Sequence, residues 1–146
     1  MMTLPPTTVI QRTEGRGYVT GYTALTLRLE DAVVLMSATF AYHILGESWL
    51  VFAALFLVPD VMMLGYLGGP RFGAAIYNAG HTYTVPALLA ASGYVFGINS
   101  VYGPAFIWIA HIGFDRSIGY GLKYNTSFND THLGMIGRSR ASQSQT

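Results

Sequence analysis

Apolar residues gather into four long blocks along this chain, and shorter polar stretches separate the blocks. The blocks run from Tyr22 to Ile44, from Trp49 to Leu67, from Arg71 to Phe96 and from Tyr102 to about Leu122. Each is close in length to the roughly 20 residues with which an α-helix crosses a hydrocarbon core of about 30 Å. The pattern therefore predicts an all-α polytopic membrane protein, a bundle of four transmembrane helices.

The segments outside the four blocks lack hydrophobic periodicity. Residues 1–21 mix Pro, Thr, Arg and Gly, and the chain ends in the polar sequence SRASQSQT. Segments of this kind do not bury enough apolar surface to offset the entropy of ordering. We expect a flexible N-terminal arm over residues 1–21, a membrane domain over residues 22–134 and a disordered tail over residues 135–146.

Basic residues fall on one side of the predicted bundle. They precede the first block, lie between the second and third, and follow the fourth, whereas the other two connections contain neither Lys nor Arg. Cytoplasmic loops of membrane proteins carry an excess of Lys and Arg. We therefore expect a multi-pass protein of the cell (inner) membrane with both termini in the cytoplasm.

The composition agrees with a membrane location and excludes several other classes. Charged residues make up only 10% of the chain and hydrophobic residues 51%, against a usual charged fraction of about 25%. The net charge of +1 and the scattered basic residues give no reason to expect a nucleic-acid partner, so the lipid bilayer is the expected partner. The absence of cysteine excludes disulfides, thiolate catalysis and cysteine-ligated metals.

Ionisable residues inside the apolar blocks are the strongest functional signal. An Asp or Arg near the centre of a membrane helix costs roughly 2.5 to 3.5 kcal/mol, so such residues normally face partners or a water-filled cavity. Asp60 is the only charged residue between Ser48 and Gly69. Counting about 1.5 Å per residue from the cytoplasmic ends places five polar residues in one layer of the inner half of the membrane. They are Asp60, Asn78, His81, His111 and Asp115.

His111 and Asp115 are four residues apart, so a helix places them on the same face. We expect Asp115 to accept a hydrogen bond from one ring nitrogen of His111, which would fix the tautomer and leave the other nitrogen for a metal or a substrate. His81 on the preceding block completes a set of imidazole and carboxylate groups. His81, His111 and Asp115 are therefore candidate ligands for a divalent zinc, iron or manganese ion.

A metal-free acid–base site is the alternative, because the chain contains no HExxH or ExxH motif. In that case His81 or His111 would be the base, and Asp60 or Glu30 the acid. Glu30 and Asp31 are adjacent and point to different sides of the first helix, and we assign Glu30 to the interior.

Further polar residues near these positions are candidates for substrate binding. They are Asn78, Tyr83, Arg116, Lys123 and His132. Arg116 points about 100° away from Asp115, so it would pair with lipid phosphate or with Asp60. His132 lies in a polar segment that would either fold back over the cytoplasmic mouth or form a solvated cap.

Three sequence blocks carry a resemblance to a known family: PDVMMLGYLGGPRFGAAIYNAGHTY, WIAHIGFDRSIGYGLKY and FNDTHLG. Over about Leu25 to Met135 the chain resembles small four-helix bacterial membrane proteins known only as a domain of unknown function, DUF4260. The resemblance implies functional positions without assigning them a role. These positions are Asp60, Asn78, His81, His111, Asp115, Arg116, Lys123 and His132.

Three functions of different class fit these expectations. The first is an enzyme that isomerises, cyclises or hydrolyses a lipophilic small-molecule substrate by acid–base or metal-assisted chemistry. The second is a proton- or metal-coupled transporter, which would act as a homodimer because four helices are few for alternating access. The third is a membrane scaffold whose buried polar pairs orient helices without chemistry.

Overall fold

The computed structural model describes Gly17 and residues 19–136, and this part of the chain is mainly helical. Residues 1–16 and 18 of the predicted arm and residues 137–146 of the predicted tail lie outside the described part. The helices and strands follow one another as α1 (Gly21–Ile44), α2 (Trp49–Phe56), the 3-10 helix η1 (Val58–Gly68), α3 (Pro70–Gly80), α4 (Thr84–Phe96), the 3-10 helix η2 (Asn99–Val101), α5 (Tyr102–Ile118), β1 (Asp130–Thr131) and β2 (Gly134–Met135).

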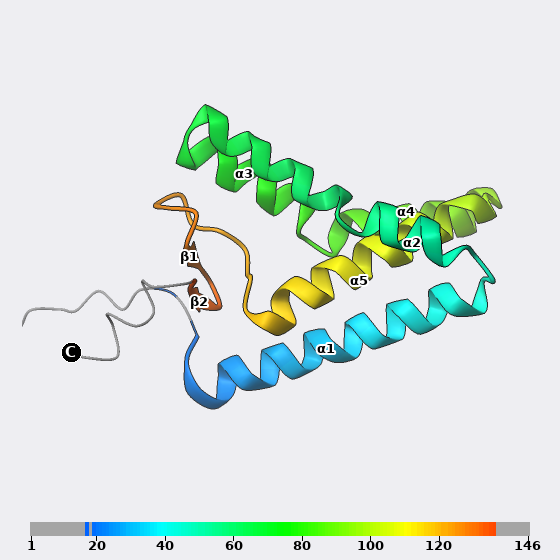
Figure 1. Cartoon of the computed structure of the whole chain (residues 1–146), viewed down its shortest axis with the longest axis horizontal. Coiled ribbons are helices and arrows are strands. Elements are labelled where there is room, and N and C mark those ends of the chain that lie inside the picture. The colour runs from blue at the N-terminus through cyan, green and yellow to red at the C-terminus, as the bar shows by residue number, and fades with distance from the viewer. Residues whose placement is uncertain (1–16, 18, 137–146) are drawn as a thin grey trace, which may run out of the picture.

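The helices form four segments that run back and forth along the long axis of the molecule (Figure 1). α1 is the first segment, α2 with η1 the second, α3 with α4 the third, and α5 the fourth. α1 and α5 lie side by side and antiparallel, and α2 and α4 also contact α5. η1 and α3 form a hairpin that diverges from α5 toward one end of the molecule.

The second segment changes from α-helix to 3-10 helix near Pro59. Proline has no backbone N–H and its ring clashes with the carbonyl four residues earlier, so the α-helical ladder does not continue through it. Of the helices in the described chain, only this one, from Trp49 to Gly68, is long and apolar enough to cross a membrane. Only 6% of its most apolar stretch is buried inside the protein.

The prediction of one continuous helix from Arg71 to Phe96 is wrong, because the third segment is broken at His81. α3 ends at Gly80, and α4 begins at Thr84. The restart places Pro86 in the first turn of α4, where a missing N–H removes no helical hydrogen bond. At the break, the His81 carbonyl oxygen accepts a hydrogen bond from Arg116 of α5.

The fourth helix ends at Ile118, earlier than the predicted Leu122, because Gly119 adopts φ +100° and turns the chain. Residues 119–136, which we call the C-terminal segment, then run between the η1–α3 hairpin and α1 (Figure 1). β1 and β2 pair within this segment, so Met135 belongs to it and not to the tail. Val19 N–H donates to the His132 carbonyl oxygen over 3.0 Å, which joins the start of the described chain to the same segment.

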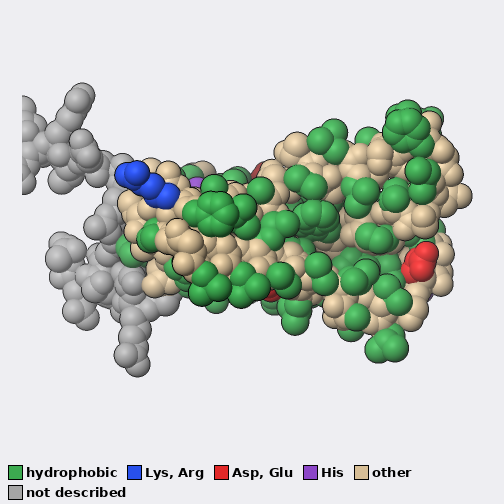
Figure 2. Space-filling view, turned by 90° about the horizontal axis from the view of Figure 1, so that it is seen from above, with side chains coloured by type: hydrophobic (Ala, Val, Ile, Leu, Met, Phe, Trp, Pro, Cys, Tyr) green, Lys and Arg blue, Asp and Glu red, His purple; other side chains and the backbone are tan. Residues whose placement is uncertain are grey.

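Large apolar side chains cover much of the outer surface. Figure 2 shows one face on which hydrophobic side chains predominate and charged side chains are sparse. On α1 and α4, Phe40, Ile44 and Leu88 are each more than 60% exposed, while Tyr42, Tyr77, Ile107 and Ile112 are fully buried in the interior. Soluble monomers rarely expose large contiguous apolar areas, and such areas mark contact with a membrane, another protein or a ligand.

Gly113 determines how closely α5 approaches α1. A methyl group on Gly113 would lie 2.8 Å from the Leu35 backbone nitrogen and 2.9 Å from the Asp31 carbonyl oxygen, and neither atom belongs to a side chain that can rotate away. Gly113→Ala should therefore lower the free energy of unfolding by about 1 to 3 kcal/mol. Gly103→Ala on the same helix is the matched control, since its methyl group would meet Tyr42 at an ordinary 3.6 Å. Equal melting temperatures for the two variants in mild detergent would contradict this packing.

Candidate metal centre

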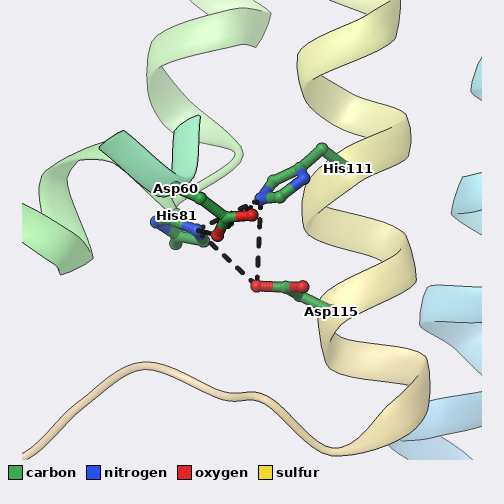
Figure 3. Close-up of side chains that lie close together, drawn as sticks. All are labelled: Asp60, His81, His111 and Asp115. Atoms are coloured by element: carbon green, nitrogen blue, oxygen red, sulfur yellow. Dashed lines mark hydrogen bonds and ion pairs between the residues drawn. The ribbon is translucent and has the colours of Figure 1, made fainter. Parts of the chain in front are cut away.

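Four ionisable side chains from three parts of the chain converge on one point (Figure 3). Asp60 lies in the first turn of η1, directly after Pro59. His81 lies at the break between α3 and α4, and His111 and Asp115 project from successive turns of α5. We call this group of four the tetrad.

The donor atoms of the tetrad are spaced as ligands of one metal ion would be. The Nε2 atoms of His81 and His111 are 3.2 Å apart, and Asp60 Oδ1 lies 3.6 Å from each of them. Asp115 Oδ2 lies 3.6 Å from His81 Nε2 and 3.9 Å from His111 Nε2. Ligands about 2.0 to 2.2 Å from a tetrahedral zinc ion are about 3.3 to 3.6 Å from one another. The tetrad could therefore hold a metal ion, and it adds Asp60 to the three ligands predicted from the sequence.

The hydrogen bonding of His81 fixes which nitrogen faces the tetrad. His81 Nδ1 is 2.9 Å from the Tyr77 carbonyl oxygen, which accepts but does not donate. Nδ1 therefore carries the proton, and Nε2 presents a lone pair to the other three residues. The Tyr77 ring stacks on the imidazole at 3.7 Å and holds its plane. A ring nitrogen bonded to a backbone carbonyl is the arrangement that orients most histidine metal ligands.

The lone pairs of the tetrad are not satisfied by the protein alone. One proton at most lies between the two Nε2 atoms, and Asp60 Oδ1 is buried without a hydrogen-bond partner among the described residues. His111 Nδ1 is likewise without a partner in this part of the chain, and the Phe56 ring packs edge-on against the imidazole. Buried polar atoms normally have partners. A positive charge between the two carboxylates and the two imidazoles would supply the partner that these acceptor atoms lack.

The predicted hydrogen bond from His111 to Asp115 is wrong. Asp115 Oδ2 approaches the same Nε2 that faces the rest of the tetrad, and the distance of 3.9 Å is too long for a hydrogen bond. The carboxylate oxygen accepts instead from the Tyr77 hydroxyl over 3.2 Å. Asp115 is therefore a fourth member of the donor set and does not orient His111 from behind.

Arg116 and Tyr83 hold the broken helix in place without reaching the tetrad. Arg116 Nη2 donates to the His81 carbonyl oxygen over 3.0 Å, and its guanidinium carbon lies 4.6 Å from the centre of the Tyr83 ring. Tyr83 in turn donates to Asp31 Oδ1 over 2.7 Å. Of the two partners predicted for Arg116, Asp60 is wrong, and lipid phosphate stays a prediction.

The assignment of Glu30 to the interior is also wrong, because Glu30 is exposed and Asp31 is buried. Adjacent helical residues point about 100° apart, so only one of the two carboxylates faces α5. The apolar residues around them in the sequence did not show which one it is. Tyr77 was missed as well. Its position one turn before His81 was the available signal, since residues four apart share a helix face.

Asn78 binds the backbone of the C-terminal segment and lies outside the tetrad. Its side-chain amide donates to the Lys123 carbonyl oxygen over 2.9 Å, and its oxygen accepts from the Lys123 N–H over 2.7 Å. His132 accepts the Leu122 N–H at Nδ1 over 2.9 Å, so this imidazole is also used to hold the segment together. Neither side chain reaches the four donor atoms.

Lys123 is buried close to the tetrad. The side chain is only 4% exposed, and Nζ has no hydrogen-bond partner among the described residues. The ammonium lies 4.2 Å from the centre of the Phe128 ring and 4.9 Å from that of Tyr77, which itself contacts His81 and Asp115. Burial lowers the pKa of Lys123 to about 8, and the nearby Asp115 carboxylate opposes the shift.

An apolar cavity of about 230 Å³ lies beside the tetrad. Its walls come from α2, η1, α4 and α5 and include Leu55, Pro59, Leu89 and Trp108. Pro59 immediately precedes Asp60, and Trp108 is one turn before His111 on the same face of α5. Two residues of the cavity wall are therefore close in the chain to members of the tetrad.

Comparison with known proteins identifies the family. Residues 24–136, which are 113 of the 146 residues, match the family described as a domain of unknown function (DUF4260), and the chain belongs to this family. The match confirms the resemblance inferred from the three sequence blocks. No curated protein and no solved structure matches the chain.

The role of His132 in the C-terminal segment predicts a dependence on pH. Burial lowers the pKa of His132 below its ordinary value of 6.5, and protonation of Nδ1 would remove the acceptor of the Leu122 N–H. The contribution of His132 to stability is therefore present above about pH 6.5 and is lost as the pH falls below that value. Hydrogen exchange of residues 119–136, corrected for intrinsic rates, should show falling protection from pH 7.5 to 5.5.

His132→Asn is the matched control for this measurement. The Asn side-chain oxygen accepts a hydrogen bond without titrating in this range. Protection in the variant should therefore stay constant with pH. The same pH dependence in both proteins would contradict the role assigned to His132.

Proposed function

We propose that this protein is an integral membrane enzyme that binds one divalent zinc, iron or manganese ion at Asp60, His81, His111 and Asp115. The ion supports acid–base chemistry of the isomerase, cyclase or hydrolase type on a lipophilic small molecule. The observation that carries the proposal is the convergence of two imidazole nitrogens and two carboxylate oxygens, all within 4.8 Å of one another.

The charges of the tetrad favour a divalent ion. Two ionised carboxylates beside two neutral imidazoles carry a charge of −2, which a divalent cation balances. An unbalanced charge in apolar surroundings costs several kcal/mol, whereas a metal ion offsets this with direct coordination. Mixed nitrogen and oxygen ligands suit zinc, iron and manganese, while a set made only of oxygens would favour magnesium or calcium.

The exposed apolar surface supports insertion of all four helical segments into the bilayer. The broken third segment is compatible with a membrane because two backbone carbonyl groups at the break have hydrogen-bond partners. The Gly80 carbonyl oxygen accepts from Trp108 Nε1 over 2.6 Å, and the His81 carbonyl oxygen accepts from Arg116. Nonhelical backbone at membrane depth is tolerated when it is buried in protein and hydrogen-bonded in this way.

The chemistry follows from the unequal burial of the two carboxylates. The Asp60 side chain is 30% exposed and that of Asp115 only 12%, so Asp60 is the member of the tetrad that an incoming molecule meets. A divalent ion held by the tetrad would act as a Lewis acid toward an oxygen of the substrate or would lower the pKa of a water molecule to about 7. Asp60 would accept or return a proton at its free carboxylate oxygen, and the apolar cavity would receive the lipophilic part of the substrate.

Metal content tests the proposal. Wild-type protein purified without chelator should contain about one equivalent of zinc, iron or manganese, and His111→Ala should lose the ion. A ligand at 100 times its dissociation constant stabilises the folded state by about 2.7 kcal/mol, so the melting temperature should fall with the metal. His43→Ala is the matched control, because His43 is exposed on α1 and lies outside the tetrad. Wild-type protein that is metal-free and takes up none of the three metals would overturn the proposal.

Cysteine labelling tests the membrane topology. The chain contains no cysteine, so an introduced cysteine is the single thiol that the reagent can label. Single cysteines at Thr7 and Ser142 should be protected from an impermeant thiol reagent in intact cells, since both termini are proposed to be cytoplasmic. A cysteine at Asn99 should be labelled from outside. Labelling of both termini in intact cells would contradict the proposed orientation.

A further inference from the structure

Lys123 has a buried positive charge that the described protein does not satisfy. The ammonium carries three N–H donors, and none has an acceptor among the described residues. Aromatic rings surround it, with Phe128, Tyr77 and Tyr120 at 4.2, 4.9 and 5.7 Å from Nζ. Ring faces attract a cation but accept no strong hydrogen bond, so the three donors remain available to an anion.

The ammonium is separated from the outside by a side chain at the surface. Phe128, the ring nearest to Nζ, is itself 38% exposed. Phe128 is not a member of the tetrad, so the exposed ring beside the ammonium is separate from the four donor residues. Asn78 meanwhile holds the Lys123 backbone with two hydrogen bonds, so the position of the residue is retained.

Trp108 of the cavity wall and two members of the tetrad follow one another along α5, and Lys123 lies just beyond the end of this helix. Trp108 lines the cavity, His111 and Asp115 belong to the tetrad, and the three side chains share one helix face at spacings of three and four residues. Lys123 follows the end of the helix, and Tyr77 contacts both it and Asp115. Along the chain the order is therefore an apolar wall, the two α5 members of the tetrad, and a positive charge.

We propose that the substrate is an amphiphile with a phosphate or carboxylate head, bound with its apolar chain in the cavity beside Trp108 and its anionic head on Lys123. The reacting group then lies between the two, at the tetrad. This inference rests on the proposed function, because it assigns a substrate class to the same centre. The anionic head supplies the hydrogen-bond acceptors that the buried Lys123 ammonium lacks, and the cavity binds the apolar chain of the substrate.

Binding of simple amphiphiles tests this assignment. The full chain, loaded with zinc in phosphatidylcholine nanodiscs, is titrated with decyl phosphate, decanoate, decanol and inorganic phosphate. Decyl phosphate or decanoate should bind at least tenfold more tightly than decanol, which lacks the anionic head, and than inorganic phosphate, which lacks the chain. The tighter of the two decyl anions identifies the head. Equal affinity for the preferred anion and decanol, or for decyl phosphate and inorganic phosphate, would overturn the inference.

Two pairs of variants assign the two ends of the ligand. Lys123→Met should weaken binding of the preferred anion at least tenfold without loss of zinc, whereas Arg71→Met removes an exposed charge and should leave the affinity unchanged. Leu89→Phe fills the cavity and should weaken the same anion, whereas Leu88→Phe alters a neighbour that is 64% exposed and should not.

The outcomes separate this inference from the proposed function. Unchanged affinity in Lys123→Met with zinc retained would overturn the substrate assignment and leave the metal centre standing. Wild-type protein that binds no zinc, iron or manganese would instead overturn the proposed function. The comparison of ligands on wild-type protein decides the substrate class even if Lys123→Met fails to fold.

Discussion

The structure depends on neutralising two carboxylates that apolar surroundings force together. Asp60 and Asp115 lie beside two imidazoles, and no Lys or Arg of the described residues forms an ion pair with either carboxylate. The Lys123 ammonium packs over the Tyr77 ring instead. Bringing like charges together in a medium of low dielectric constant is unfavourable by many kcal/mol unless a proton or a cation intervenes. The proposed divalent ion would remove this repulsion and would bind the lone pairs that have no partner among the described residues.

The helices around the tetrad fix its geometry in ways that a straight bundle would not. The break at His81 turns an imidazole inward, the Tyr77 carbonyl oxygen sets its tautomer, and Arg116 secures the free backbone carbonyl of the same residue. Pro59 similarly changes the helix type just before Asp60. Irregular backbone thus coincides with two of the four ligands, as expected where a functional site takes precedence over regular secondary structure.

The sequence predicted those parts of the site that depend on helical spacing and on the high free-energy cost of burying a charge. His111 and Asp115 share a face because they are four residues apart, and Asp60 stood out as a lone charge in an apolar block. The features that the sequence did not predict depend on contacts between segments. The break at His81, the choice of Asp31 over Glu30 and the hydrogen bond from Tyr77 to Asp115 each follow from which side chain meets α5. No periodicity along one helix contains that information.

X-ray absorption at the edge of the bound metal tests the central claim most directly. The account predicts only nitrogen and oxygen ligands at about 2.0 to 2.2 Å, with the outer scattering of two imidazole rings, reduced to one ring in His81→Ala that is reloaded with an excess of the metal. Manganese or iron in the same site would give slightly longer distances with the same two rings. A spectrum without imidazole scattering, or one that His81→Ala leaves unchanged, would show that the metal binds elsewhere and would contradict the account.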